Sequence, residues 1–355
     1  MTKAYSLLIL MLGVILTRPA AAEQFIFVAL GDTAYNLPAD IPRYELLIDT
    51  INASEPAFTI HVGDTWGALV CTEESHRRIL EWFQRYDHPL IYTPGDNEWT
   101  DCRKPEIIDA YIKIITGKAT PAEQKLIGDA YQLDNAIAGT SFADTIASLK
   151  TIRKVFFSEA RSLGKQTIPL VRQSDVSVFT QMAENVRWEK SGVIFATISV
   201  PGSGMNFTIN DPVRAQEAIH RNKADVEWIK ATFSEATEKN ASAVVIALHA
   251  SLFVEGDGGE FSNRRLRGGQ EGPYFWIALA IRDLAEKFAK PVLVINGDFH
   301  DLIIDRPFLL SQGESRTPKH DNITRLQVYG APELKAVTIS VDTQTPWIFS
   351  FSPLY

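Results

Sequence analysis

Four aspartates follow glycine at the ends of short apolar runs, and this placement predicts a metal site. They are Asp32, Asp64, Asp96 and Asp298. Short apolar runs of this kind are typical of buried strands in a parallel sheet, and ligands of α/β proteins bind outside the carboxyl ends of such strands. Four carboxylates at one edge of one sheet repel each other unless a cation lies between them. The sequence therefore predicts a metal ion at that edge.

Strands and helices alternate in the part of the chain that carries the first three aspartates. Between residues 24 and 100 the order is strand, helix, strand, helix, strand, with helices predicted over 41–52 and 72–84. This alternation indicates a parallel sheet with crossover helices. Residues 104–175 are polar and Ala-rich with helical periodicity. We interpret them as a mostly helical insertion over the sheet edge or, alternatively, as a separate small domain.

The sheet pattern returns after residue 175. Strands are predicted over 193–200 and 243–248, and helices over 213–238 and 274–287. Short alternating runs follow at 302–305, 323–328, 336–341 and 347–351. These runs indicate antiparallel strands that form a second sheet, which would make a sandwich with the first.

The first 22 residues have the features of a secretory signal peptide. Lys3 precedes an apolar stretch over residues 5–16, and Ala20-Ala21-Ala22 forms a small-residue cleavage pattern. We therefore expect a secreted or periplasmic protein with a mature domain over residues 23–355; a retained N-terminal anchor is the alternative. No other stretch approaches the length of a membrane span, so no span is expected after cleavage.

The charge of the chain restricts its partners. Without the leader, 33 basic residues stand against 43 acidic ones, a formal charge of about −10. This charge opposes binding of nucleic acid or anionic lipid as a general mode. Binding of a phosphorylated substrate then requires local positive charge, which bound metals would supply.

The chain has two cysteines, Cys71 and Cys102, each a few residues beyond a Gly-Asp strand end. In an oxidising compartment they are well placed for a disulfide that braces the loops carrying Asp64 and Asp96. Two free buried thiols are the alternative. The count and spacing exclude a Cys-rich zinc site.

The strand ends resemble the sequence blocks of the calcineurin-like metallophosphoesterases. In order they read Gly31-Asp-Thr-Ala-Tyr35, Gly63-Asp-Thr-Trp-Gly67, Pro94-Gly-Asp-Asn-Glu98, Ala247-Leu-His249 and Gly297-Asp-Phe-His300. The family blocks run D-x-H, G-D, G-N-H-[DE], a lone strand-end His, and G-H-x-H. The resemblance implies a four-layer α/β/β/α sandwich of two mixed sheets flanked by helices. It also implies hydrolysis of a phosphate mono- or diester by metal-bound hydroxide between two metal ions.

The resemblance assigns the metal ligands block by block. Asp32 and His300 would hold the first ion, and Asp64 would bridge both. Asp96, His249 and Asp298 would hold the second ion.

The chain departs from the family at four ligand or catalytic positions, in three of the blocks. Ala34 stands where the family has the His of D-x-H, and Asp298 stands where it has the first His of G-H-x-H. Asp96 and Asn97 replace the Asn and His of G-N-H, so the usual catalytic His is absent. Two neutral ligands thus become carboxylates. Oxygen-rich ligation favours Mn²⁺, Mg²⁺ or iron over zinc.

Other polar residues near these blocks carry alternatives. Tyr35 is a candidate phenolate ligand, as in the purple acid phosphatases, or it packs over the site. Asn97 and Glu98 are candidates for positioning substrate or shuttling a proton, with structural turn roles as the alternative. His61 is interpreted as structural. The loop cations Arg264, Arg265 and Arg267 either reach an anionic substrate or form a solvated cluster. The remaining histidines, His76, His88, His220 and His320, are expected at the surface.

These patterns favour a metal-dependent phosphoesterase that acts on a small phosphorylated substrate. The alternatives are a purple-acid-like phosphatase, a degenerate envelope protein that binds metal or ligand without turnover, and an interaction protein that uses the 104–175 insertion. The substrate and the oligomeric state stay open.

Overall fold

The computed structural model describes residues 24–66, 71–102, 113, 117–125, 144–254, 265–266, 272–307 and 322–355. The expected leader over residues 1–22 lies outside these ranges. Of the insertion expected over 104–175, most of the part between 104 and 143 also lies outside them. Within the described ranges, no helix is both long and apolar enough to cross a membrane.

The first sheet has five strands in the order β14-β13-β1-β2-β3. Its members are β1 (Phe25–Leu30), β2 (Thr59–His61), β3 (Leu90–Tyr92), β13 (Ala336–Val341) and β14 (Phe349–Leu354). Strands β1, β2 and β3 are parallel, whereas β13 is antiparallel to both β1 and β14. The carboxyl ends of the three parallel strands therefore meet at one edge.

The second sheet has seven strands in the order β11-β12-β10-β7-β6-β5-β4. Its members are β4 (Val171–Arg172), β5 (Val186–Lys190), β6 (Val193–Thr197), β7 (Ala243–Ala247), β10 (Val292–Asn296), β11 (Ile303–Asp305) and β12 (Ile323–Gln327). The central strands β6, β7, β10 and β12 are parallel. A separate two-stranded ribbon pairs β8 (Phe253–Val254) with β9 (Arg265–Leu266).

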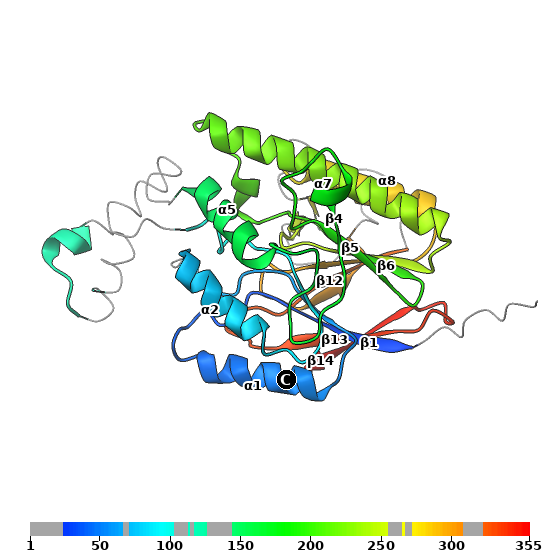
Figure 1. Ribbon diagram of the computed structural model, residues 1–355, viewed down its shortest axis with the longest axis horizontal. Coiled ribbons are helices and arrows are strands. Elements are labelled where there is room, and N and C mark those ends of the chain that lie inside the picture. The colour runs from blue at the N-terminus through cyan, green and yellow to red at the C-terminus, as the bar shows by residue number, and fades with distance from the viewer. Residues whose placement is uncertain are drawn as a thin grey trace, which may run out of the picture.

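Helices cover the outer faces of the two sheets, so the expected sandwich of two mixed sheets is confirmed (Figure 1). On the five-stranded sheet they are α1 (Ile41–Ala53), α2 (Glu73–Phe83) and α5 (Thr145–Phe156). On the seven-stranded sheet they are α7 (Pro212–Glu238) and α8 (Phe275–Phe288). Two further short elements are α6 (Gln173–Val176) and the 3₁₀ turn η1 (Ser203–Asn206).

The alternation of side chains along the strands produces the layers. In β1, Phe27 and Ala29 pack between the two sheets, whereas Val28 and Leu30 pack under α1 and α2. Successive strand residues point to opposite faces, so an apolar strand that is buried on both sides fills two cores at once. This double burial explains why the runs before the Gly-Asp pairs are continuously apolar.

The expectation that the last four strands form their own antiparallel sheet is wrong. Strands β11 and β12 extend the seven-stranded sheet, where β12 runs parallel to β10. Strands β13 and β14 instead cross to the five-stranded sheet beside β1. Alternation along a strand predicts that it is half-buried, but it contains no information about which neighbour satisfies its hydrogen bonds.

The helix ends follow local chemistry. Thr72 caps α2, because its Oγ1 accepts a hydrogen bond from the Ser75 amide at 3.1 Å, and Glu73 and Glu74 occupy the first turn. Asp211 caps α7 through the Val213 amide at 2.9 Å. In the region expected to be an insertion, α5 packs its buried Leu149 into the same core as α2.

A disulfide joins Cys71 and Cys102, as the sequence predicts, with 5.6 Å between the Cα atoms. It ties the segment after β2 to the segment after β3, across 31 residues. These segments begin with Asp64 and Asp96, so the cross-link holds together two of the loops that carry carboxylates.

The double variant Cys71→Ser/Cys102→Ser should be less stable by about 3–4 kcal/mol, because it releases a closed loop of about 30 residues in the unfolded chain. Urea unfolding of the oxidised wild type and the variant measures this difference. Reduced wild type is the matched control and should unfold at the same urea concentration as the variant. Coincident curves for oxidised wild type and variant would contradict the prediction.

Candidate metal centre

The candidate ligands come from strand ends of both sheets. Asp32, Asp64 and Asp96 follow β1, β2 and β3, while His249 follows β7 and Asp298 follows β10. The expectation that all four aspartates share one sheet is therefore wrong. They meet because the parallel strands of both sheets end on the same side, as hydrogen bonds between the two sets of loops show.

Hydrogen bonds cross between the sheets at this end, and two of them join a candidate ligand to a backbone group. The Asp298 amide donates to Asp32 Oδ1 at 3.0 Å, and His249 Nδ1 bonds the carbonyl of Val62 at 2.8 Å. Each bond joins a loop of the seven-stranded sheet to a loop of the five-stranded sheet. The relative position of the two ligand sets is thereby fixed by backbone groups.

The donor atoms form two groups that share His249. One group is Asp32, Asp64 and His249, and the other is Asp96, His249 and Asp298. Within each group the candidate ligand atoms all lie within 4.8 Å of one another. Two adjoining groups of three are compatible with two neighbouring cations.

Both histidines present Nε2 to carboxylates. The carbonyls of Val62 and Ala331 accept hydrogen bonds of 2.8 Å from Nδ1 of His249 and His300, respectively. A carbonyl only accepts, so each bond fixes a proton on Nδ1. Nε2 of His249 lies 3.5 Å from Asp64 Oδ1, and Nε2 of His300 lies 3.6 Å from Asp32 Oδ1. Backbone carbonyls orient metal-binding histidines in this way.

Two buried polar atoms of the centre have no hydrogen-bond partner within the described residues. They are Asp32 Oδ2 and His249 Nε2. Buried polar atoms are almost always paired, so a bound ion, ligand or water would explain such orphans. The donor set of the two groups, four carboxylates and one imidazole, suits a hard or borderline divalent cation. The residues present therefore fit a metal.

Burial dominates the electrostatics of these carboxylates. It raises the pKa of Asp32 to about 7 and that of Asp64 well above the ordinary range. For His249, burial acts to lower the pKa, but the surrounding carboxylates, Asp64 foremost, raise it well above its ordinary value. In the metal-free protein the surrounding carboxylates therefore favour the protonated form of His249.

The backbone is strained at the same residues. Asp32, Asp64, Asp298 and His300 have φ of 49°, 55°, 79° and 65°. Non-glycine residues adopt the left-handed region infrequently, with Asp, Asn and His the most tolerant. Strain of this kind persists only where the surrounding structure imposes it, and it is common at functional sites.

Tyr35 and Asn97 form a hydrogen-bonded layer behind Asp64. The Tyr35 hydroxyl donates to Asp64 Oδ2 at 2.7 Å and accepts from Asn97 Nδ2 at 2.8 Å. The backbone N–H of Asn97 donates to Asp64 Oδ1 at 3.0 Å. Burial raises the pKa of Tyr35 far above its ordinary range, and the negative charge of Asp64 adds to the effect. In this arrangement the phenol is a neutral donor that orients Asp64.

Glu98 braces the loops. Its carboxylate accepts hydrogen bonds from the amides of Asp64, Thr65 and Gly95 at 3.0, 2.8 and 2.8 Å, and from the Thr65 hydroxyl at 3.0 Å. These four bonds occupy both oxygens of a buried side chain. This geometry favours the structural role over proton transfer, which leaves Asn97 as the candidate for contact with substrate.

Sequence reasoning missed three residues that contact the carboxylates. The Ser203 hydroxyl donates to Asp96 Oδ2 at 2.8 Å, and the Ser251 amide donates to Asp298 Oδ2 at 3.0 Å. Gly202 packs so closely that a methyl group there would overlap Asp96 Oδ2. The signal was the run Pro201-Gly-Ser-Gly204, which directly follows the predicted strand over 193–200.

The other histidines and the loop cations lie in different surroundings. The expected surface position is wrong for His76 and His88, which are buried; His88 bonds Thr59 Oγ1 at 2.7 Å. His61 is fully buried, and this lowers its pKa to about 3. His220 is exposed. The side chains of Arg264, Arg265 and Arg267 lie outside the described residues, as does His320.

Solved structures with a similar fold were found at low sequence identity. PhoD matches with a TM-score of 0.47 and 10% identity over 92% of this chain, which spans 65% of PhoD. A dimetal phosphatase from Danio rerio matches with a TM-score of 0.47 and 8% identity, over 93% of this chain and 98% of that one. GAP50, described as the anchor in the inner membrane complex of Plasmodium, matches with a TM-score of 0.42 and 10% identity, over 93% and 88%. No protein-family profile and no curated protein matches the sequence.

Metal-free Asp32→Asn protein should gain stability over wild type as pH rises. The raised pKa means that folded wild type holds a proton on Asp32 more tightly than unfolded wild type. The resulting stabilisation is present below pH about 4 and is lost as pH rises towards 7. The uncharged amide does not incur this loss. Urea unfolding in chelator between pH 4.5 and 7.5 measures the difference.

Asp49→Asn on α1 is the matched control, because Asp49 is an exposed aspartate outside the centre. The difference in free energy of unfolding between Asp49→Asn and wild type should stay constant across the same pH range. If the Asp32→Asn difference is also flat, the carboxylate is not held protonated by its burial.

Proposed function

We propose that the protein is a phosphoesterase that uses two divalent metal ions at this centre. Asp32 and His300 would hold one ion, Asp96, His249 and Asp298 would hold the other, and Asp64 would bridge them. The observation that carries the proposal of a metal centre is the pair of adjoining three-residue groups with shared His249 and orphaned buried donor atoms. The bridging role of Asp64 and the role of His300 come from the order of the sequence blocks. The order of the sequence blocks supports phosphate esters as the substrate class.

When bound, such ions polarise phosphoryl oxygens and lower the pKa of a water that attacks phosphorus. The chain's own residues supply orientation. The carbonyls of Val62 and Ala331 hold the two imidazoles, and Tyr35 and Asn97 hold the Asp64 carboxylate. Asn97 is half-buried, with its amide group beside Tyr35, and can donate a hydrogen bond to a phosphoryl oxygen.

The extra carboxylates affect substrate choice. Asp96 and Asp298 stand where the family has neutral ligands, so the centre attracts a phosphate dianion less strongly than a family centre does. A phosphodiester carries one negative charge, so its attraction to the centre is reduced less. The family's His is also replaced by Asn97, which weakens protonation of poor leaving groups. We therefore expect a preference for diesters or for esters with good leaving groups.

The disulfide between Cys71 and Cys102 supports an oxidising compartment, so a secreted or periplasmic location is part of the proposal. We further propose that residues 23–355 form one domain. The metal is proposed as Mn²⁺, Mg²⁺ or iron on the chemistry of the oxygen ligands. A protein that binds metal without turnover is the second candidate, favoured by Ala34, which leaves no imidazole at that family position.

Asp64→Asn should lower metal content at both positions, because Asp64 is assigned to both ions, whereas Asp32→Asn should empty mainly one. Elemental analysis of the purified proteins measures this, with Asp49→Asn as the control that keeps wild-type content. Activity of Asp64→Asn should fall by more than the roughly 10–100-fold typical of a residue behind a ligand. Full occupancy in Asp64→Asn would falsify the bridging assignment. Full metal content without hydrolysis in wild type would support the non-catalytic candidate.

Asp298→His should shift preference towards monoesters, since it removes one negative charge beside the substrate. The expected change in the ratio of kcat/KM for 4-nitrophenyl phosphate and bis(4-nitrophenyl) phosphate is on the order of tenfold. His is among the residues that tolerate the left-handed backbone at this position. An unchanged ratio means that the charge of the ligand set does not select the substrate.

A further inference from the structure

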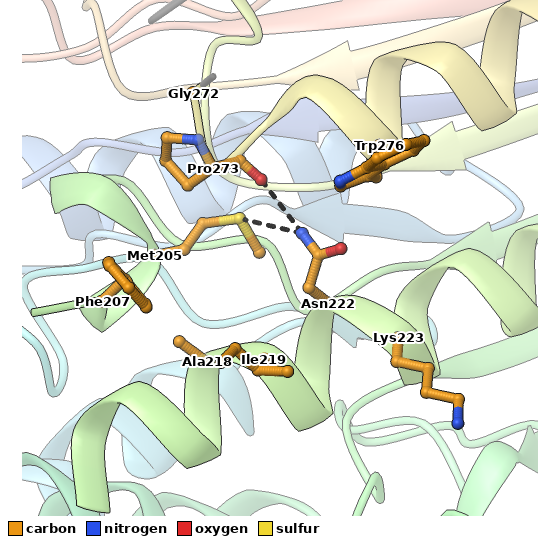
Figure 2. Close-up of a pocket in the computed structure, with 9 residues that line it drawn as sticks. All are labelled: Met205, Phe207, Ala218, Ile219, Asn222, Lys223, Gly272, Pro273 and Trp276. Atoms are coloured by element: carbon orange, nitrogen blue, oxygen red, sulfur yellow. Dashed lines mark hydrogen bonds between the residues drawn. The ribbon is translucent and has the colours of Figure 1, made fainter. Parts of the chain in front are cut away.

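A cavity of about 430 Å³ lies between η1, α7 and the start of α8 (Figure 2). Its lining residues are Met205, Phe207, Ala218, Ile219, Asn222, Lys223, Gly272, Pro273 and Trp276. Pockets that bind small organic molecules have volumes of roughly 300–1,000 Å³ and are mostly apolar with a few polar groups. The size and lining of this cavity agree with that description.

The rim of the cavity exposes large apolar side chains. Phe207, Ile219 and Trp276 are 50%, 62% and 60% exposed, whereas Met205 and Ala218 are buried in the floor. Single exposed apolar residues are common, but three around one cavity indicate a surface that binds an apolar group. The thioether of Met205 adapts readily to the shape of a ligand.

One short segment forms both the cavity wall and a wall of the metal centre. Gly202 packs against the carboxylates of Asp96 and Asp298, and the Ser203 hydroxyl bonds Asp96. Met205, three residues after Gly202, lies in the floor of the cavity. Three residues of chain span at most about 11 Å. The metal centre and the cavity therefore adjoin one short segment, at its Gly202 and Met205 ends respectively.

The position of this segment is fixed. Ser203, Gly204, Met205 and Asn206 all have φ between 45° and 65°, an energetically unfavourable left-handed turn. The fully buried Arg221 holds it by donating to the Met205 carbonyl at 2.7 Å, and the Gly204 amide donates to the Tyr274 hydroxyl at 3.2 Å. The distance between the cavity and the metal centre is thus set by the fold.

The polar groups of the cavity favour an anionic amphiphile. Asn222 Nδ2 donates to the Pro273 carbonyl at 3.0 Å, which closes one side. Lys223 is exposed at the rim, and no described residue forms an ion pair with it. A long cation beside an apolar surface can accompany a negatively charged molecule whose apolar part is buried.

We propose that this cavity is the subsite for an alkyl or acyl group of the substrate, so that the enzyme acts on amphiphilic phosphate esters. The inference rests on the proposed phosphoesterase function. The phosphate group lies at the metal centre, and the apolar group passes the 202–206 turn and occupies the cavity. Hydrolysis breaks the phosphorus–oxygen bond with water and leaves the apolar group intact.

Calorimetric titration of the Mn²⁺-loaded protein with n-butyl and n-octyl phosphonate, which have no phosphorus–oxygen ester bond to hydrolyse, tests the subsite without catalysis. Each methylene buried in the cavity should strengthen binding about fourfold, or on the order of 100-fold between the two chains. Ile219→Asp, which places a charge at the rim, should lower the affinity for the octyl compound at least tenfold and leave the affinity for the butyl compound unchanged. Trp276→Ala is a second variant expected to weaken octyl binding. Leu46→Asp on α1 is the control, because Leu46 is 66% exposed and distant in the fold.

Hydrolysis of methyl and octyl 4-nitrophenyl phosphate with Mn²⁺ gives the second readout. The octyl ester should have the higher kcat/KM, and Ile219→Asp should reduce the octyl-to-methyl ratio. Chain-selective binding without hydrolysis of either ester supports the cavity and overturns the phosphoesterase function. Hydrolysis of both esters with equal affinity for both alkyl phosphonates supports the function and overturns the cavity. A dimer that Ile219→Asp dissociates assigns the cavity to a second copy and also overturns it.

Discussion

Mutual repulsion among buried carboxylates is the constraint on which the rest of this structure depends. Asp32, Asp64 and Asp96 are buried at the junction of two sheets, and the Asp298 carboxylate lies against them. In the absence of a cation, burial and like charge raise the pKa of two of these groups, and the carboxylates raise the pKa of His249. A bound cation would make this costly assembly of charges favourable.

The fold holds this arrangement from several directions. The cross-sheet bonds from the Asp298 amide and His249 lock the two sheets at the centre, and Glu98 and the disulfide lock the loops of one sheet. The left-handed backbone at four candidate ligands shows that these restraints outweigh local preference. The two cores on either side of each sheet supply the stability that such local strain consumes.

The local elements could be predicted from the sequence better than their partners. Continuous apolar runs ending in Gly-Asp identified β1, β2, β3 and β10, because strands buried on both faces have this pattern. The same reasoning placed Asp298 in the wrong sheet and grouped β11 to β14 together, because strand pairing depends on contacts distant in sequence. His88 was misplaced for a similar reason: a polar residue in a loop can be buried when a neighbour satisfies it, as Thr59 does. His76 is buried on α2 with its ring against Phe156 of α5.

The turn over residues 202–206 shows why part of the site could not be predicted at all. Its left-handed conformation depends on Arg221 and Tyr274, which are contributed by α7 and by the segment before α8. No local preference of Ser203 or Met205 favours that conformation, so only the assembled fold specifies it. In the same turn, Ser203 donates a hydrogen bond to Asp96 and Met205 lines the apolar cavity. One strained segment therefore links the charge of the metal centre to the surface that would select an apolar substrate, which couples chemistry and specificity through backbone geometry.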